Sequence, residues 1–287
     1  MSICLRSGLR QVIAALALVS AAPVASGAAG VARADCFPLE QLPPDLRQKS
    51  EALLLRALDT EALYTFVGDL KPMSSFTELR VPLDKLDLAT VEATRRALRA
   101  WRCGDDYFAD VHHFVQPHDN RLYLEGAIWN RITLGKLIAQ HEPYFKRFGL
   151  TPSSHPMEVT MAVEYDTAPE RFRGYGYLYG YPDYAVDFFV DAENQRKKTG
   201  RSVPRDIVSM PTYARSAQLY AWTVPKGHQE NDVDERIRRQ VLAILNDYLA
   251  RRPKYIGAGK PGVVALLRDW LDDGKGRCSA ANVTVRY

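Results

Sequence analysis

Two stretches of alternating apolar and polar residues, 107–116 and 121–129, constrain most strongly how this chain can fold. The residues between them, Pro117 to Asn120, have side chains and backbones that suit a tight turn. The pattern therefore predicts a β-hairpin. If Gln116 faces Arg121, the register of the whole hairpin is set, because a slip of one residue would turn every side chain to the other face.

This register divides the side chains of the hairpin between two faces. The first face is apolar and is expected to pack on the core: Ala109, Val111, His113, Val115, Leu122, Leu124 and Ile128. The second face mixes large rings with ionisable groups: Phe108, Asp110, His112, Phe114, Tyr123, Glu125 and Trp129. His112 is expected directly opposite Glu125.

Asp110, His112 and Glu125 are therefore the candidate catalytic residues. A carboxylate beside an imidazole can hold it as a general base, and two carboxylates with an imidazole are also ordinary ligands of a divalent metal ion. The pattern identifies neither a metal nor a cofactor. The alternative is a cross-strand charged pair on an amphipathic sheet, with no chemical role.

The segment 173–182 is unusually rich in tyrosine. As a strand it would place Tyr175, Tyr177, Tyr179 and Tyr181 on one face, as a platform on which sugars or flat molecules could stack. Thr167 to Glu170 forms a capping-box pattern and favours a helix instead. Both packing and ligand binding remain open. The candidate ligand-binding residues are Phe114, Tyr123, Trp129, Tyr175, Tyr179 and Tyr181.

The remaining pattern predicts an α+β fold dominated by helices, in a single domain over residues 35–287. The expected helices cover 44–58, 87–101 with Asp87 as the cap, 133–148 with Thr133 as the cap, 156–165, a segment that starts at Thr167, 183–198 with Asp183 as the cap, 231–252 between Asn231 and Pro253, and 262–272. Further short strands are expected at 217–224 and 282–286.

Residues 1–34 have the pattern of a cleaved export signal. Arg6 and Arg10 precede a short apolar run, and Ala32-Arg33-Ala34 has the form that signal peptidase accepts. The run is too short to cross a bilayer, so no stable membrane insertion is expected after cleavage. The alternatives are a buried N-terminal helix or a retained anchor. The pattern predicts a periplasmic or secreted protein.

The charge of the chain argues against nucleic-acid partners, and its cysteine content fits export. Without residues 1–34 the chain has 35 basic and 34 acidic residues, and it lacks the basic surface expected of a protein that binds nucleic acid. Cys36, Cys103 and Cys278 remain, which allows one disulfide and one thiol. We favour the pair Cys36–Cys103, which would tie the new N-terminus to the end of a helix.

Familiar catalytic motifs are missing from the sequence. His141-Glu142 begins like the zinc-protease motif but lacks its second histidine, and neither G-x-S-x-G nor S-x-x-K occurs. We expect His113 and His141 in the core, with a metal site that includes Glu142 as the alternative.

Three functions stay open. The first is an exported domain that binds a small molecule or a glycan, such as an envelope component. The second is a hydrolase-like enzyme that uses the His/carboxylate cluster, with or without a metal. The third is an envelope protein that only binds partners.

Overall fold

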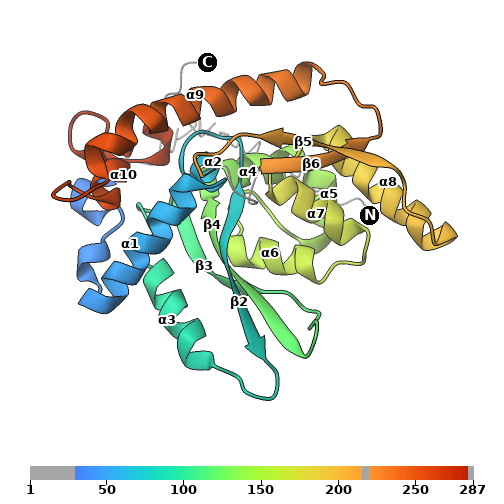
Figure 1. Ribbon diagram of the computed structural model, residues 1–287, viewed down its shortest axis with the longest axis horizontal. Helices are drawn as coiled ribbons and strands as arrows, with labels where there is room; N and C mark the ends of the chain where they lie inside the picture. The colour runs from blue at the N-terminus through green and yellow to red at the C-terminus, as the bar shows by residue number, and fades with distance from the viewer. Residues whose placement is uncertain (1–29, 215–219, 284–287) are drawn as a thin grey trace, which may run out of the picture.

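The computed structural model describes residues 30–214 and 220–283, which form ten α-helices and seven strands (Figure 1). The predicted α+β class with a majority of helix is confirmed. The helices are α1 Pro44–Asp59, α2 Leu63–Phe66, α3 Leu88–Leu98, α4 Arg131–Gln140, α5 Glu142–Phe145, α6 Pro156–Glu164, α7 Glu170–Leu178, α8 Asp183–Thr199, α9 Asp232–Tyr255 and α10 Val263–Leu271. The strands are β1 Val31–Ala32, β2 Met73–Pro82, β3 Tyr107–His113, β4 Arg121–Asn130, β5 Arg205–Met210, β6 Tyr220–Pro225 and β7 Arg277–Cys278.

The largest sheet has the antiparallel order β2-β4-β3. The predicted hairpin forms from β3 and β4 in the predicted register, with His112 opposite Glu125. The expected pairing of Gln116 with Arg121 was wrong, because the chain turns at Asp119 and Asn120, both with positive φ, and Arg121 pairs with His118 instead. Strand β2 was not predicted. It pairs along the other side of β4, so the hairpin becomes part of a sheet through a contact between segments far apart in sequence.

Helices cover both faces of this sheet (Figure 1). On one face lie α1 and α3, where Phe76 of β2 stacks on Trp101 with ring centroids 4.7 Å apart. On the other face lie α6 and α7, and there the Trp129 indole donates a hydrogen bond of 3.0 Å to Thr160 of α6. The aromatic face of the hairpin is therefore packed against helices.

Several predicted helix starts are confirmed, because their caps satisfy free backbone groups. Asp87 accepts from the Thr90 amide at 3.0 Å. Asn231 accepts from the amides of Val233 and Asp234 at the start of α9.

Other predicted helix boundaries were wrong. Asn130, not Thr133, caps α4, which stops at Gln140 where the chain turns before Pro143. Neither Thr167 nor Asp183 is a cap: α7 begins after Pro169 without a side-chain cap, and Asp183 is already the first residue of α8.

Two further expectations fail. Pro253 does not stop α9, which continues to Tyr255 although proline has no amide hydrogen to donate. His113 is exposed at the end of β3 and does not enter the core. Residues 217–219 of one expected strand and 284–286 of the other lie outside the described residues, and Ala280–Asn282 forms a 3₁₀ turn.

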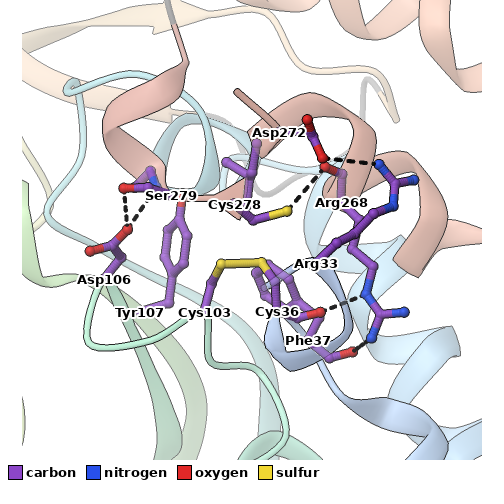
Figure 2. The surroundings of a disulfide bond; sticks show 12 residues. Arg33, Cys36, Phe37, Cys103, Asp106, Tyr107, Arg268, Asp272, Cys278 and Ser279 are labelled. Carbon is purple, nitrogen blue, oxygen red and sulfur yellow. Dashed lines mark hydrogen bonds and ion pairs between the residues drawn. A yellow bond between two sulfur atoms is a disulfide. The ribbon is translucent and has the colours of Figure 1, made fainter. Parts of the chain in front are cut away.

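The predicted disulfide Cys36–Cys103 is present and joins the segment before α1 to the loop after α3 (Figure 2). Cys278 is a free, buried thiol that donates to the Arg268 carbonyl at 3.4 Å, and burial raises the pKa of this thiol. Nearby, β1 pairs with β7, and Arg33 contacts Asp272. The end of the predicted export signal thus makes contacts with the fold, and its cleavage stays a prediction.

A second hairpin, β5–β6, packs beside α8 and completes the wall of the site described next. In residues 30–214 and 220–283, we find no helix that is both long and apolar enough to cross a membrane.

Candidate functional site

An aromatic cavity of about 350 Å³ lies between α7, α8 and the β5–β6 hairpin, and we call it the tyrosine pocket. Its volume is in the range of pockets that hold small organic ligands. It is lined by Phe172, Tyr175, Gly176, Tyr179, Tyr181, Ala185, Val186, Phe189, Ile207, Ala221, Trp222 and Thr223. Six of these residues have aromatic rings, and none has a charged side chain.

Helix α7 gives the pocket its shape. Tyr175, Gly176 and Tyr179 lie on one side of this helix, as residues four positions apart do. A Cβ atom at position 176 would lie 2.6 Å from a methyl carbon of Val186, so glycine is required for α7 and α8 to pack this closely. The helical interpretation of the tyrosine-rich segment is therefore confirmed, and it still brings three predicted tyrosines to one cavity.

The hydroxyl groups of Tyr175 and Tyr179 already have hydrogen-bond partners within the protein. Tyr175 Oη donates to Glu164 Oε2 at 2.7 Å, and Tyr179 Oη lies 3.4 Å from Ser75 Oγ. Burial raises the pKa of Tyr175, Tyr179 and Tyr181, so all three remain neutral phenols at neutral pH. A ligand would therefore meet mainly the carbon surfaces of these rings.

A buried lysine lies beneath the tyrosines. Lys71 Nζ lies 4.6 Å from the ring centroid of Tyr220 and 5.4 Å from that of Tyr179, and it donates to Glu61 at 2.8 Å. Its side chain is fully buried, and this burial lowers the pKa of Lys71. The ring faces and the Glu61 carboxylate favour the charged form of Lys71 and so oppose the effect of burial.

The predicted catalytic residues occupy a different place. His112 Nε2 lies 3.6 Å from Glu125 Oε2, and the His112 side chain is enclosed by Phe114 and Trp129. Among the described residues, neither these two atoms nor His112 Nδ1 has a hydrogen-bond partner. The pair is close, as predicted, but lies in the packed layer between the sheet and α7.

Asp110 does not join this pair. Its carboxylate accepts two hydrogen bonds from Arg95 of α3, at 2.8 and 3.2 Å. Such a bidentate pair uses both carboxylate oxygens. The structure therefore separates Asp110 from His112 and Glu125.

The other predicted ligand residues are dispersed. Phe114 packs near Tyr175, with ring centroids 6.1 Å apart, but is not part of the cavity wall. Tyr123 lies toward the hairpin turn, beneath the guanidinium of Arg80. Trp129 is fully buried in the core.

Sequence reasoning missed half of the aromatic wall. Phe172, Phe189 and Trp222 come from α7, α8 and β6 and meet only in the folded chain. A weak signal exists for Trp222, because the alternation at 217–224 predicts a strand. In the part of the chain that the structure describes, no three His, Cys, Asp or Glu side chains gather as metal ligands would.

Comparison with protein families, with curated proteins and with solved structures found no match for this chain. A proposal for the function of this chain therefore has to rest on the geometry and chemistry of its own cavities.

Proposed function

We propose that this protein binds a small, flat, mainly apolar molecule in the tyrosine pocket. The observation that carries the proposal is a cavity of about 350 Å³ whose wall holds six aromatic rings and no charged side chain. Aromatic and apolar walls with few polar groups are typical of small-molecule sites. Burial of the ligand's apolar surface would supply most of the binding free energy.

The same wall argues against a glycan in this pocket. Sugar hydroxyls need hydrogen-bond partners, because a buried unpaired hydroxyl costs free energy. The hydroxyls of Tyr175 and Tyr179 have partners inside the protein, which leaves chiefly Tyr181 and Thr223. An aromatic or alicyclic compound suits such a wall better than a sugar.

We place this function outside the cytoplasm. The export pattern of residues 1–34 supports this location, and so does the Cys36–Cys103 disulfide, because disulfides persist in oxidising compartments. The hydrolase alternative has weaker support, since neither His112 nor Glu125 lines the tyrosine pocket.

The test is calorimetric titration with indole, which is flat and nearly apolar, and with glucose as a polar probe of similar size. Ala221 lines the pocket from β6, so Ala221→Trp should fill it. Ala139→Trp adds the same side chain at an exposed position on α4 and is the matched control. A cooperative thermal unfolding transition is required of both variants as the check that they fold.

We expect indole to bind the wild type and Ala139→Trp equally, with the negative heat-capacity change of apolar burial. Binding to Ala221→Trp should be at least about tenfold weaker, and glucose should not compete with indole. Equal indole affinity in both variants, or no binding to the wild type, would overturn the proposal.

A further inference from the structure

A second cavity, which we call the polar cleft, lies on the other side of the end of α7. Its volume is about 540 Å³, and α4, the start of α8 and the first turns of α9 enclose it. The polar side chains used below are Asp69, Lys136, Gln140, His141, Asp183 and Arg236. None of these residues lines the tyrosine pocket.

The charges of the polar cleft balance. Lys136 Nζ lies 3.7 Å from Asp69, and His141 Nε2 lies 3.4 Å from Asp183. Burial of the His141 imidazole lowers its pKa despite the nearby Asp183 carboxylate, so the ring is neutral at neutral pH. With Arg236 the wall has two cations and two carboxylates. A charged ligand would be attracted by the two groups of opposite sign and repelled by the two groups of its own sign.

A neutral polyhydroxyl ligand suits this wall. Each hydroxyl both donates and accepts hydrogen bonds, so neighbouring hydroxyls can satisfy carboxylates and cationic donors at once. The side chains of Gln140 and Arg236 are exposed, and within the described ranges neither makes a hydrogen bond or an ion pair. Both are therefore available to a ligand.

The polar cleft also offers ring surfaces. The His141 ring stacks on Tyr177 with centroids 3.8 Å apart and planes 15° apart, and Tyr184 lines the wall near Asp183. The C–H faces of a sugar can pack on such carbon surfaces while its hydroxyls bond to the polar side chains.

We propose that the polar cleft is a second binding site and that it takes a neutral saccharide, independently of the ligand of the tyrosine pocket. The site requires Gln140 and Arg236 as hydrogen-bond donors from α4 and α9. It differs in chemistry from the tyrosine pocket because its wall combines apolar residues with charged and amide side chains.

The test uses the full chain in saturation-transfer NMR and calorimetry. The neutral probes are glucose, galactose, N-acetylglucosamine, maltotriose and chitotriose, and glucuronate and glucosamine are the charged counterparts. Leu137→Trp should fill the polar cleft, and Gln140→Ala and Arg236→Ala remove its free donors. Arg239→Ala, also exposed on α9 but outside the cleft, is the matched control.

We expect at least one neutral probe to bind at millimolar concentration, with an affinity that does not change with salt. Gln140→Ala and Arg236→Ala should each weaken it about fivefold to tenfold, as loss of a hydrogen bond does, and Leu137→Trp should abolish it. Arg239→Ala should have no effect. Ala221→Trp should not alter saccharide binding either, which separates this result from failure of the tyrosine pocket.

Three outcomes would overturn the proposal. The first is that no neutral probe binds the wild type. The second is that a probe binds equally well to folded Leu137→Trp. The third is that only glucuronate or glucosamine binds, with an affinity that falls as salt rises, since this would show that one charge dominates the cleft.

Discussion

The tyrosine pocket and the polar cleft lie on two sides of one short segment, and only the cleft has charged side chains in its wall. Tyr175 and Tyr179 face the first, Tyr177 and Gly180 line the second, and Tyr181 contributes to both. In the pocket, aromatic residues of α8 and β6 complete an apolar wall. In the cleft, charged residues of α4 and α9 surround similar rings. The neighbours of these tyrosines, more than the tyrosines themselves, therefore set the chemistry of each cavity wall.

The tyrosines beside the two cavities pack on a buried lysine, and removal of the partner of this lysine should have the largest effect on stability. Glu61→Ala leaves Lys71 Nζ unpaired in a fully buried position. We expect the free energy of unfolding to fall by about 3–5 kcal/mol, as measured by urea denaturation. Glu51→Ala removes an exposed pair with Arg47 and should cost less than about 1 kcal/mol. Similar losses in both variants would show that the Lys71 pair has no special role.

The end of α7, which separates the two cavities, depends on Gly180. This residue has φ +71°, and an added Cβ would collide with the backbone carbonyl of Leu70. Gly200 has φ +69° at the end of α8 but open space around it, so it is the control. Gly200→Ala should cost about 1 kcal/mol through its backbone alone. Gly180→Ala should cost about 1–3 kcal/mol more, and equal shifts in chemical denaturation would contradict the close packing at the cleft wall.

A change confined to the pocket should separate the cavities functionally. Phe172→Ala removes one ring of the aromatic wall, and we expect indole affinity to fall about tenfold. Saccharide binding should not change. Phe188→Ala, beside the pocket residue Phe189 but outside the wall, serves as the matched control. If Phe188→Ala weakens indole binding as much, the effect comes from general loosening of α8.

The smallest predicted effect is a change of stability with pH, and it involves only His141 in the wall of the polar cleft. Burial lowers the pKa of His141 in the folded protein, and the nearby charge of Arg173 lowers it further. Asp183 and Asp187 act in the opposite direction but do not outweigh burial. Below about pH 6.5, the ordinary pKa of histidine, the unfolded chain therefore takes up a proton at His141 more readily than the folded protein does. The free energy of unfolding should fall as the pH is lowered. Wild-type thermal stability should decrease more than that of His141→Gln between about pH 7 and 5. If the wild type and His141→Gln lose stability in parallel, the pH dependence does not come from His141.

The sequence predicted best what local rules determine. The strict alternation along both strands specifies the register of β3 and β4, and Asp87 and Asn231 cap helices as their side chains suggest. Asn130 was missed as a cap because it belongs to the end of a strand as well as to the start of α4.

Features that depend on contacts between distant segments could not be predicted in this way. Strand β2 is ordered by pairing with β4, and Lys71 is buried only because tyrosines from the end of α7 and from β6 close over it. Sequence reasoning also expected Asp110 to lie with His112, since alternation places them on one face. It could not foresee that Arg95 of α3 would bind the Asp110 carboxylate at the edge of the sheet.

The most direct test of the tyrosine pocket is NMR of protein with protonated tyrosine rings in a deuterated background, with indole added. We predict intermolecular NOEs from indole to the rings of Tyr175, Tyr179 and Tyr181, assigned by single Tyr→Phe variants. The exposed Tyr165 should show none. NOEs to Tyr165 alone, or to no tyrosine while indole binds, would contradict a ligand site in this pocket.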